Sequence, residues 1–329
     1  MKRQGGDLFD RIVSKENLLL AHKNARKGKT TYKQVQWVDA NLEQVLNELQ
    51  QMLIKGTFTT SKYVVEEGMK GGKIRKIHKL PYYPDRIVQH AIIQQCGDIW
   101  VKSMIRDTFQ SIKGRGTKDC IKRVRRAIQK NKPKYALKLD IKKFYQNIKN
   151  EILLSPEILR IKCKRTFSLL KNIIQSLPEV PLGNFTSQFF GNLILTPLDW
   201  YCKQSLKIKY YFRYCDDIII MSNFKISLLS WKLKIKEKLK IFNLQIKENI
   251  NIVELYKESL NFVGVKITQS KLKLRNKIST NFKNKRRNKN IKCIPSYFGW
   301  CQYTNSMKLF YKYVPSGNWW KIAKEVSCY

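Results

Sequence analysis

Residues 210–221 read YYFRYCDDIIIM, and this stretch decides the fold. Two runs rich in aromatic and β-branched residues, which favour strands, flank the adjacent carboxylates of Asp216 and Asp217. The pattern predicts two strands joined by a tight turn that carries both aspartates. Adjacent carboxylates repel each other, and a bound divalent cation offsets that repulsion. The turn is therefore a candidate metal site, although an isolated pair of aspartates is more often a solvated surface turn.

A third carboxylate ends a separate apolar run upstream. Residues 136–139 (ALKL) predict a short buried strand, and Asp140 follows directly. Mg²⁺ prefers carboxylate and phosphate oxygens as ligands. Two such ions lower the pKa of an attacking hydroxyl and hold a triphosphate, so three aspartates suit phosphoryl transfer. Asp140, Asp216 and Asp217 are the candidate catalytic and metal-binding residues for two Mg²⁺ ions, with the backbone carbonyl of Ile141 as a further ligand and Mn²⁺ as a substitute.

The charge of the chain points to a polyanionic partner. Among 329 residues, 65 are Lys or Arg and 24 are Asp or Glu, which gives a formal net charge of +41. A lysine-rich genome raises the size of such an excess but does not set its sign. Nucleic acid fits best, because its phosphates attract cationic side chains without any sequence code. No run of about 18 apolar residues occurs, so we expect no membrane partner.

Cysteine usage and the N-terminal sequence indicate a cytoplasmic protein. The eight cysteines include no CxxC pair, and the histidines are not spaced with them as zinc ligands. The N-terminus lacks the charged-then-apolar pattern of a signal peptide. We therefore expect reduced thiols and a cytoplasmic location.

Hydrophobic periodicity predicts an α+β chain. Helical patterns occupy residues 1–60, 85–104, 117–129, 158–177, 185–201 and 228–242. Strand patterns occupy 63–67 and 73–80, which form a hairpin with a basic second strand, and 136–139, 210–221 and 261–268. Beyond residue 268 the sequence is basic and interleaved with aromatic residues, which predicts a small helical unit that faces nucleic acid.

In their order along the chain, these motifs resemble those of reverse transcriptases. YCDD at 214–217 is similar to the Tyr-x-Asp-Asp box of the family, and LDIKKFY at 139–145 is similar to its upstream aspartate box. PLGNFTSQ at 181–188 resembles the loop that receives the incoming nucleotide and the template base. KIR at 73–75 and DRIVQH at 85–90 resemble the fingers. The resemblance covers roughly residues 15–310.

The resemblance implies a right-hand polymerase with an α+β fold. Fingers would span residues 1–135, with the N-terminal helices and the basic hairpin. A palm with an antiparallel sheet would span 136–268, and a basic helical thumb would span 269–329. The implied activity is RNA-directed DNA polymerisation, in which dNTPs are joined on a template RNA and an RNA/DNA duplex forms.

The resemblance also implies roles for residues around the aspartates. Arg75 would contact the triphosphate with help from Lys73, unless both are basic residues of a strand that faces solvent. Tyr145 resembles the steric gate that rejects the ribonucleotide 2′-hydroxyl, unless it is an aromatic core residue. Lys247 would protonate pyrophosphate. The nucleotide pocket would be shaped by Leu182, Gly183, Ser187 and Gln188, and the primer grip would be formed by Phe262, Val263 and Gly264.

The central loop resembles that of one branch of the family. Retroviral and group II intron enzymes usually carry Gln-Gly-x-x-x-Ser-Pro there, whereas LGNFTSQ at 182–188 is similar to the form in reverse transcriptases of diversity-generating retroelements, a group II intron-like lineage. KGRGT at 113–117 agrees. The resemblance implies copying with errors at template adenines, mutagenic retrohoming, and a small basic accessory variability protein that forms oligomers. A bacterium, a phage or a mobile element would encode such a chain.

Other interpretations remain open at this point. Cys215 departs from the Met, Val or Ala that this branch more often has in the YxDD box. A stand-alone defence or abortive-infection enzyme, or another group II intron-like reverse transcriptase, would share the same palm. A non-catalytic RNA-binding module is a third interpretation, and the intact set of three aspartates argues against it.

Overall fold

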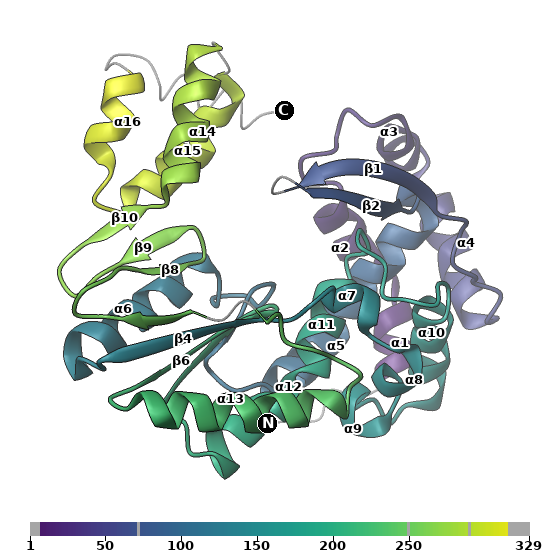
Figure 1. Ribbon diagram of the computed structural model, residues 1–329. Helices are drawn as coiled ribbons and strands as arrows, with labels where there is room; N and C mark the ends of the chain where they lie inside the picture. Colours follow the sequence, from purple (N-terminus) through teal and green to yellow (C-terminus); the bar gives the residue numbers. More distant parts are fainter. Residues whose placement is uncertain (1–6, 71–72, 249–250, 289–290, 315–329) are drawn as a thin grey trace. The chain divides into compact units, whose positions relative to one another are not determined.

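The structure is a computed structural model that describes residues 7–70, 73–248, 251–288 and 291–314 (Figure 1). The chain divides into two compact units. Unit 1 comprises residues 1–106, 141–205 and 235–246, and unit 2 comprises residues 107–140, 206–234 and 247–329. From the sequence we expect three consecutive segments, fingers, palm and thumb, with boundaries at residues 135 and 268. The two units are each made of several segments, and that three-part division stays a prediction.

Unit 1 is mainly helical. Its helices are α1 (Leu8–Val13), α2 (Lys15–Ala25), α3 (Lys33–Ala40), α4 (Leu42–Ile54), η1 (Tyr82–Arg86), α5 (Ile87–Ser103), α7 (Phe144–Asn147), α8 (Asn150–Leu153), α9 (Pro156–Leu159), α10 (Lys164–Ile174), α11 (Ser187–Ile194), α12 (Thr196–Trp200) and η2 (Tyr201–Ser205). α4 shows why these segments are helical. Its buried residues Val45, Leu46, Leu49 and Leu53 recur at three- and four-residue steps, so one face packs inward.

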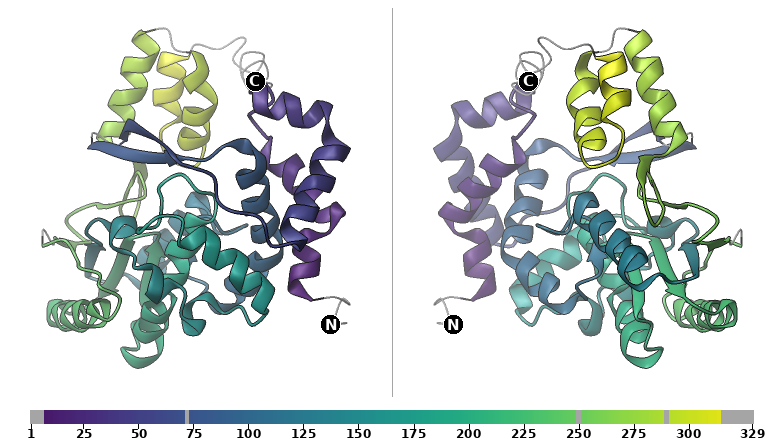
Figure 2. Two further views of the ribbon diagram at one scale, coloured as in Figure 1. Left: turned by 90° about the vertical axis from the view of Figure 1, so that its right-hand side faces the viewer. Right: turned by 90° about the vertical axis from the view of Figure 1, so that its left-hand side faces the viewer.

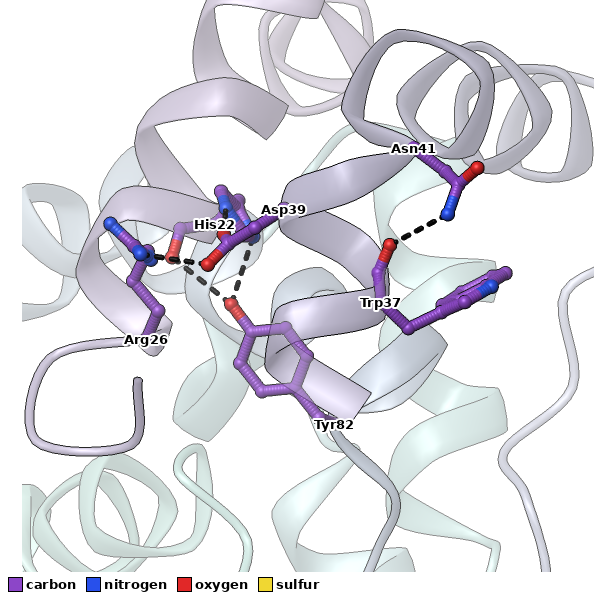
Figure 3. Close-up of polar contacts among 6 residues, drawn as sticks. All are labelled: His22, Arg26, Trp37, Asp39, Asn41 and Tyr82. Atoms are coloured by element: carbon purple, nitrogen blue, oxygen red, sulfur yellow. Dashed lines mark hydrogen bonds and ion pairs between the residues drawn. The ribbon is translucent and has the colours of Figure 1, made fainter. Parts of the chain in front are cut away.

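A polar cluster joins α2, α3 and η1 inside unit 1 (Figure 3). His22 Nε2 lies 2.9 Å from Asp39 Oδ1, and Arg26 donates to the other carboxylate oxygen at 2.7 Å. On the far side of the imidazole, the Tyr82 hydroxyl lies 2.9 Å from His22 Nδ1. Both ring nitrogens therefore have partners although His22 is only 3% exposed. The cluster fixes the N-terminal helices to the segment that leads into α5.

The basic hairpin predicted from the sequence is present in unit 1. Strands β1 (Val64–Lys70) and β2 (Lys73–Lys79) pair antiparallel, with Gly68 opposite Arg75 and Lys70 opposite Lys73. The side chains of Lys73 and Arg75 lie outside the described part of the chain, so their predicted contact with a triphosphate stays a prediction.

Unit 2 is built on a five-stranded sheet in the order β3-β5-β6-β4-β7. The strands are β3 (Thr108–Phe109), β4 (Tyr135–Asp140), β5 (Tyr210–Tyr214), β6 (Asp217–Ser222) and β7 (Ile252–Glu254). Residues 218–221 of β6 are all buried, as expected of a central strand covered on both faces. Helix α6 (Thr117–Asn131) covers one face, where its Val124 shares an apolar cluster with Ala136 and Ile219.

A second sheet and a group of helices complete unit 2. Strands β8 (Leu260–Phe262), β9 (Val265–Ile267) and β10 (Leu272–Leu274) form a three-stranded antiparallel sheet. Helices α14 (Asn276–Arg287), η3 (Ile291–Cys293), α15 (Ile294–Gln302) and α16 (Met307–Tyr313) follow, and both views of Figure 2 show them packed together. Phe282 stacks on Phe310 and Tyr297, so aromatic residues form the core of this group.

Helix α13 (Lys225–Lys240) belongs partly to each unit. Lys225, at its start, forms an ion pair of 2.6 Å with Glu254 of β7 within unit 2. Among the helices of the described residues, none is long and apolar enough to cross a lipid bilayer.

Most elements predicted from the sequence are confirmed, but two predicted helices are wrong in extent. The helix expected over 158–177 is broken between α9 and α10, because Arg160 adopts a left-handed conformation (φ 55°) that ends α9. The helix expected over 185–201 begins at Ser187 and is interrupted at Leu195. Pro197 lacks an N–H and sits in the first turn of α12, so a new helix starts there.

Candidate active site

The three candidate aspartates are brought to one end of the unit 2 sheet. Asp140 is the last residue of β4 and lies opposite Asp217, the first residue of β6, in their antiparallel register. Tyr214 lies opposite Asp217 from the other side, on β5. Asp216 occupies the turn between β5 and β6. The predicted strand–turn–strand element is therefore confirmed, and the separate strand that ends at Asp140 pairs with it.

The turn is held in shape by residues on both sides of the aspartates. Cys215 adopts a left-handed conformation (φ 56°), which most residues avoid. Arg213 is fully buried, and its Nη1 donates to the carbonyl oxygen of Cys215 at 3.0 Å. The Tyr214 hydroxyl lies 2.9 Å from the Thr117 hydroxyl at the start of α6. These contacts stabilise a backbone geometry that presents Asp216 at the tip.

Charge is concentrated at this end of the sheet. Burial, followed by repulsion from Asp217 and from Asp140, raises the pKa of Asp216 above its ordinary value. Two lysines partly offset the three negative charges. Lys138 Nζ lies 3.0 Å from Asp217 Oδ1, and the Lys247 ammonium contacts the Asp140 carboxylate. The backbone N–H of Lys247 also donates to the Asp140 carbonyl oxygen at 2.8 Å.

The donor set fits a divalent cation, although the side chains are not arranged as a complete coordination sphere. Within the described residues, no group of three or more His, Cys, Asp and Glu side chains is positioned to hold a metal ion. Three oxygen donors that repel one another and already attract two ammonium groups are nevertheless the chemistry that Mg²⁺ prefers. Asp140, Asp216 and Asp217 would hold such ions. The further ligand at the carbonyl of Ile141 stays a prediction.

A predicted nucleotide loop in unit 1 is fixed against the hairpin. The backbone N–H of His78 in β2 donates to the carbonyl oxygen of Leu182 at 2.9 Å. Gly183 follows at φ 142°, and a Cβ built there would lie 2.1 Å from the His78 carbonyl oxygen. Only glycine allows this approach. The Ser187 hydroxyl donates to the carbonyl oxygen of Pro181 at 2.7 Å, which closes the loop, whereas Gln188 is exposed.

Residues that the sequence reasoning missed hold the middle of this loop. The side chain of Asn184 donates to the Tyr63 hydroxyl at 2.8 Å, and Gln89 Oε1 accepts from the backbone N–H of Phe185 at 2.7 Å. The His90 ring stacks on Phe185 with centroids 3.8 Å apart. These residues come from distant elements, so no local pattern could have connected them. His90 is a packed residue of helix α5.

Tyr145 packs against helix α11 in unit 1. A Cβ built at Gly191 would lie 3.1 Å from Cε1 of both Phe144 and Tyr145, which is closer than ordinary contacts. The absence of a side chain at position 191 therefore lets the Tyr145 ring lie against the helix. Tyr145 stays partly exposed, whereas Phe144 is 3% exposed and belongs to the core. The predicted role of Tyr145 as a steric gate stays a prediction.

The residues predicted as a primer grip form the β8–β9 turn in unit 2. Phe262 is buried in the cluster beneath α6, and Val263 and Gly264 have positive φ values of 43° and 80°. A Cβ built at Gly264 would lie 2.7 Å from the Trp300 ring. The turn is thereby packed on α15, and contact of this turn with a primer stays a prediction.

Comparison with known proteins agrees with this geometry. Residues 68–275 match the family model described as reverse transcriptase (RNA-dependent DNA polymerase). A comparison with curated proteins finds no match.

Solved structures that are similar to the chain include telomerases. Telomerase from Candida albicans, in complex with a fragment of telomeric RNA, is 12% identical with a TM-score of 0.50, and the match covers 67% of this chain and 46% of that one. Apo telomerase from Candida tropicalis is 14% identical with a TM-score of 0.47, and the match covers 70% and 53%. Apo telomerase from Candida tropicalis truncated from the C-terminal domain is 14% identical with a TM-score of 0.48, and the match covers 67% of this chain and 55% of that one. This chain therefore spans about half the length of these telomerases.

The family match covers more than half of the chain and includes all three aspartates. The mixed helices and sheets of the two units, and the likeness to the Candida albicans telomerase, are those of the right-hand polymerase fold. The chain belongs to the reverse transcriptase family, whose members are RNA-dependent DNA polymerases and hence nucleotidyltransferases.

Proposed function

We propose that this chain copies a template RNA into cDNA from dNTPs, with Asp140, Asp216 and Asp217 as its catalytic carboxylates and Mg²⁺ as its cofactor. The observation that supports the proposal most is the register of β4 and β6, which sets Asp140 opposite Asp217 beside the turn that carries Asp216. Three acidic side chains close together repel one another and lower stability. Their clustering in a chain of net charge +41 therefore indicates a functional site.

The surrounding side chains have separate roles in this proposal. Divalent cations held by the three aspartates would supply charge neutralisation of the triphosphate and a lower pKa at the primer 3′-hydroxyl. Lys138 and Lys247 reduce repulsion among the carboxylates before substrate binds, because their ammonium groups contact Asp217 and Asp140. Lys247 then gives a proton to the departing pyrophosphate.

The roles assigned to unit 1 rest on the family resemblance. Arg75, with Lys73, binds the triphosphate, because a guanidinium pairs with phosphate oxygens through two parallel hydrogen bonds. Tyr145 excludes the ribonucleotide 2′-hydroxyl. Leu182, Gly183, Ser187 and Gln188 line the nucleotide pocket. The hydrogen bond that fixes the loop to β2, and the Ser187–Pro181 bond that closes the loop, support a rigid pocket wall. In unit 2, the turn at 262–264 grips the primer.

We place the chain in the diversity-generating branch of the family, on the sequence LGNFTSQ at 182–188 and KGRGT at 113–117. Its template would be a repeat RNA copied with errors at adenines in mutagenic retrohoming. Its partner would be a small basic accessory protein that forms oligomers, and it would work in the cytoplasm. A defence reverse transcriptase or another group II intron-like enzyme is the alternative within the same fold.

Primer extension tests the proposal. A DNA primer on an RNA template, with dNTPs and Mg²⁺, should be extended by the wild-type chain and not by the double variant Asp216→Asn/Asp217→Asn. Sequencing of the product separates the branches, because substitutions concentrated opposite template adenines support the diversity-generating assignment and evenly spread errors contradict it. Absence of product from the wild type, also with its template RNA and accessory protein present, would contradict the polymerase proposal itself.

A further inference from the structure

Helix α6 carries a row of cationic side chains outside its buried face. Lys122, Arg126 and Lys130 stand four residues apart, so successive groups lie about 6 Å apart along the helix axis. All three are exposed. None of them forms a salt bridge with any residue that the structure describes. The opposite face of α6 is apolar and buried, so packing does not require this row.

The row lines one wall of an open groove within unit 2. The groove has a volume of about 530 Å³ and lies between α6 and the start of β5. Lys209 and the partly exposed ring of Tyr210 form the other wall. Five cationic and two acidic side chains line the groove, and Arg123 neutralises the acidic Asp107 at 2.7 Å. The surface that remains open is strongly positive.

The groove runs away from the catalytic turn. At the start of α6, the Thr117 hydroxyl lies 2.9 Å from the hydroxyl of Tyr214 in the YCDD box. Near the other end of the helix, Gln129 donates to the carbonyl oxygen of Gln269 at 3.1 Å. The row from Lys122 to Lys130 therefore begins about one helical turn beyond the Tyr214 contact and leads toward the far end of the sheet.

We propose that this groove binds a single strand of nucleic acid through its phosphates, at a site separate from the catalytic carboxylates. Evenly spaced cations without salt-bridge partners can meet successive phosphates of an extended strand, and each contact releases counterions. The partly exposed Tyr210 ring, over which Lys209 Nζ lies 5.3 Å from the ring centroid, supplies aromatic surface for a base at this wall of the groove. RNA and DNA share the phosphodiester chemistry, so the site recognises a strand rather than a sequence. The inference does not depend on catalysis.

The salt dependence of binding tests the groove directly. The triple variant Lys122→Gln/Arg126→Gln/Lys130→Gln should bind fluorescently labelled oligouridine and oligothymidine more weakly than the wild type. Three lost phosphate contacts should reduce the slope of log K against log salt by about 2, because each contact on a single strand contributes about 0.7. The matched control is Lys232→Gln/Lys236→Gln/Lys240→Gln on α13, which removes the same charge at the same spacing outside the groove.

The two variants give clear outcomes. A loss confined to the α6 variant, for either strand, supports the groove, and the ratio of the RNA and DNA losses shows whether the 2′-hydroxyl contributes. An equal loss in both variants would show that the net charge alone binds the strand and would overturn the inference. The inference would also be overturned if the α6 variant bound both oligonucleotides as the wild type does but no longer bound polyglutamate. That result would indicate an acidic protein partner.

A second pair of variants covers the case in which the triple variant unfolds. Tyr210→Leu should weaken binding of both oligonucleotides several-fold without changing the salt slope, whereas Tyr210→Phe, which keeps the ring, should bind like the wild type. Equal binding by Tyr210→Leu and the wild type would show that the ring does not contribute to the site. It would contradict the proposal that the groove binds a strand.

Discussion

Asp140 and Asp217 lie directly opposite each other in the antiparallel pairing of β4 and β6. Like charges across a strand pair destabilise a sheet, and here the next turn adds Asp216. Lys138 stands two residues before Asp140, so it points to the same side of β4 and reaches Asp217 at 3.0 Å. Lysine side chains thus form ion pairs with these carboxylates, at the site where a polymerase needs divalent cations.

Removal of Lys138 should expose this repulsion. The Lys138→Gln variant should lose about 1 kcal/mol of stability without metal, because a partly exposed ion pair contributes little more. Its melting temperature should fall by about 2–4 °C without metal, and added Mg²⁺ should raise it by more than in the wild type. Calorimetry with and without Mg²⁺ measures both effects. Equal melting temperatures for the two proteins in both conditions would contradict the role given to Lys138.

Gly183→Ala should separate the nucleotide loop from the hairpin. A Cβ at this position would overlap the His78 carbonyl oxygen, and φ 142° suits glycine alone. We expect a loss of about 2–3 kcal/mol and a raised KM for dNTPs. Gly97→Ala is the matched control, since its Cβ would meet neighbours at an ordinary 3.8 Å inside helix α5. A KM for dNTPs that rises equally in both variants would contradict the role of the 181–188 loop in nucleotide binding.

Replacement of Tyr145 should change sugar selection. If its ring excludes the 2′-hydroxyl, Tyr145→Val should raise the relative incorporation of ribonucleotides by roughly 10–200-fold, whereas Tyr145→Phe should keep the discrimination of the wild type. Single-nucleotide incorporation kinetics with dNTP and rNTP measure the ratio. An unchanged ratio in Tyr145→Val would assign the residue to the core packing that it shares with Phe144 and Gly191.

His90 should make the fold sensitive to acid. Burial lowers its pKa to about 4, so the folded state favours the neutral ring, and Arg86 adds to the effect. The unfolded chain takes up the proton near pH 6.5, so stability is full above that pH and is lost as pH falls toward 4. The loss should reach about 3 kcal/mol.

His90→Phe keeps the stack on Phe185 and removes the titrating group. Urea unfolding of the variant between pH 7 and pH 4 should therefore show a smaller loss of stability than unfolding of the wild type. Parallel curves for the two proteins would show that His90 is not the titrating group.

The sequence predicted structure correctly where it depends on neighbouring residues, and it failed where it depends on contacts between residues far apart in the chain. Strand propensity on both sides of residues 216–217 predicted β5, the turn and β6 correctly, and the apolar run before Asp140 predicted β4. The short strands β3, β7 and β10 were missed, because two or three residues carry no periodicity. Gln89 and Tyr63 were also missed as supports of the 181–188 loop, since their partners lie about a hundred residues away.

In the proposed mechanism, Asp140 acts together with the YCDD turn in RNA-templated DNA synthesis. Single-turnover incorporation of one dNTP on a primed RNA template tests it most directly, with Asp140→Asn compared with Asp98→Asn, a change of the same chemistry at an exposed position of α5. We predict a rate loss of about a thousandfold or more for Asp140→Asn and a wild-type rate for Asp98→Asn, with both proteins folded. Incorporation by folded Asp140→Asn at the wild-type rate would contradict the account.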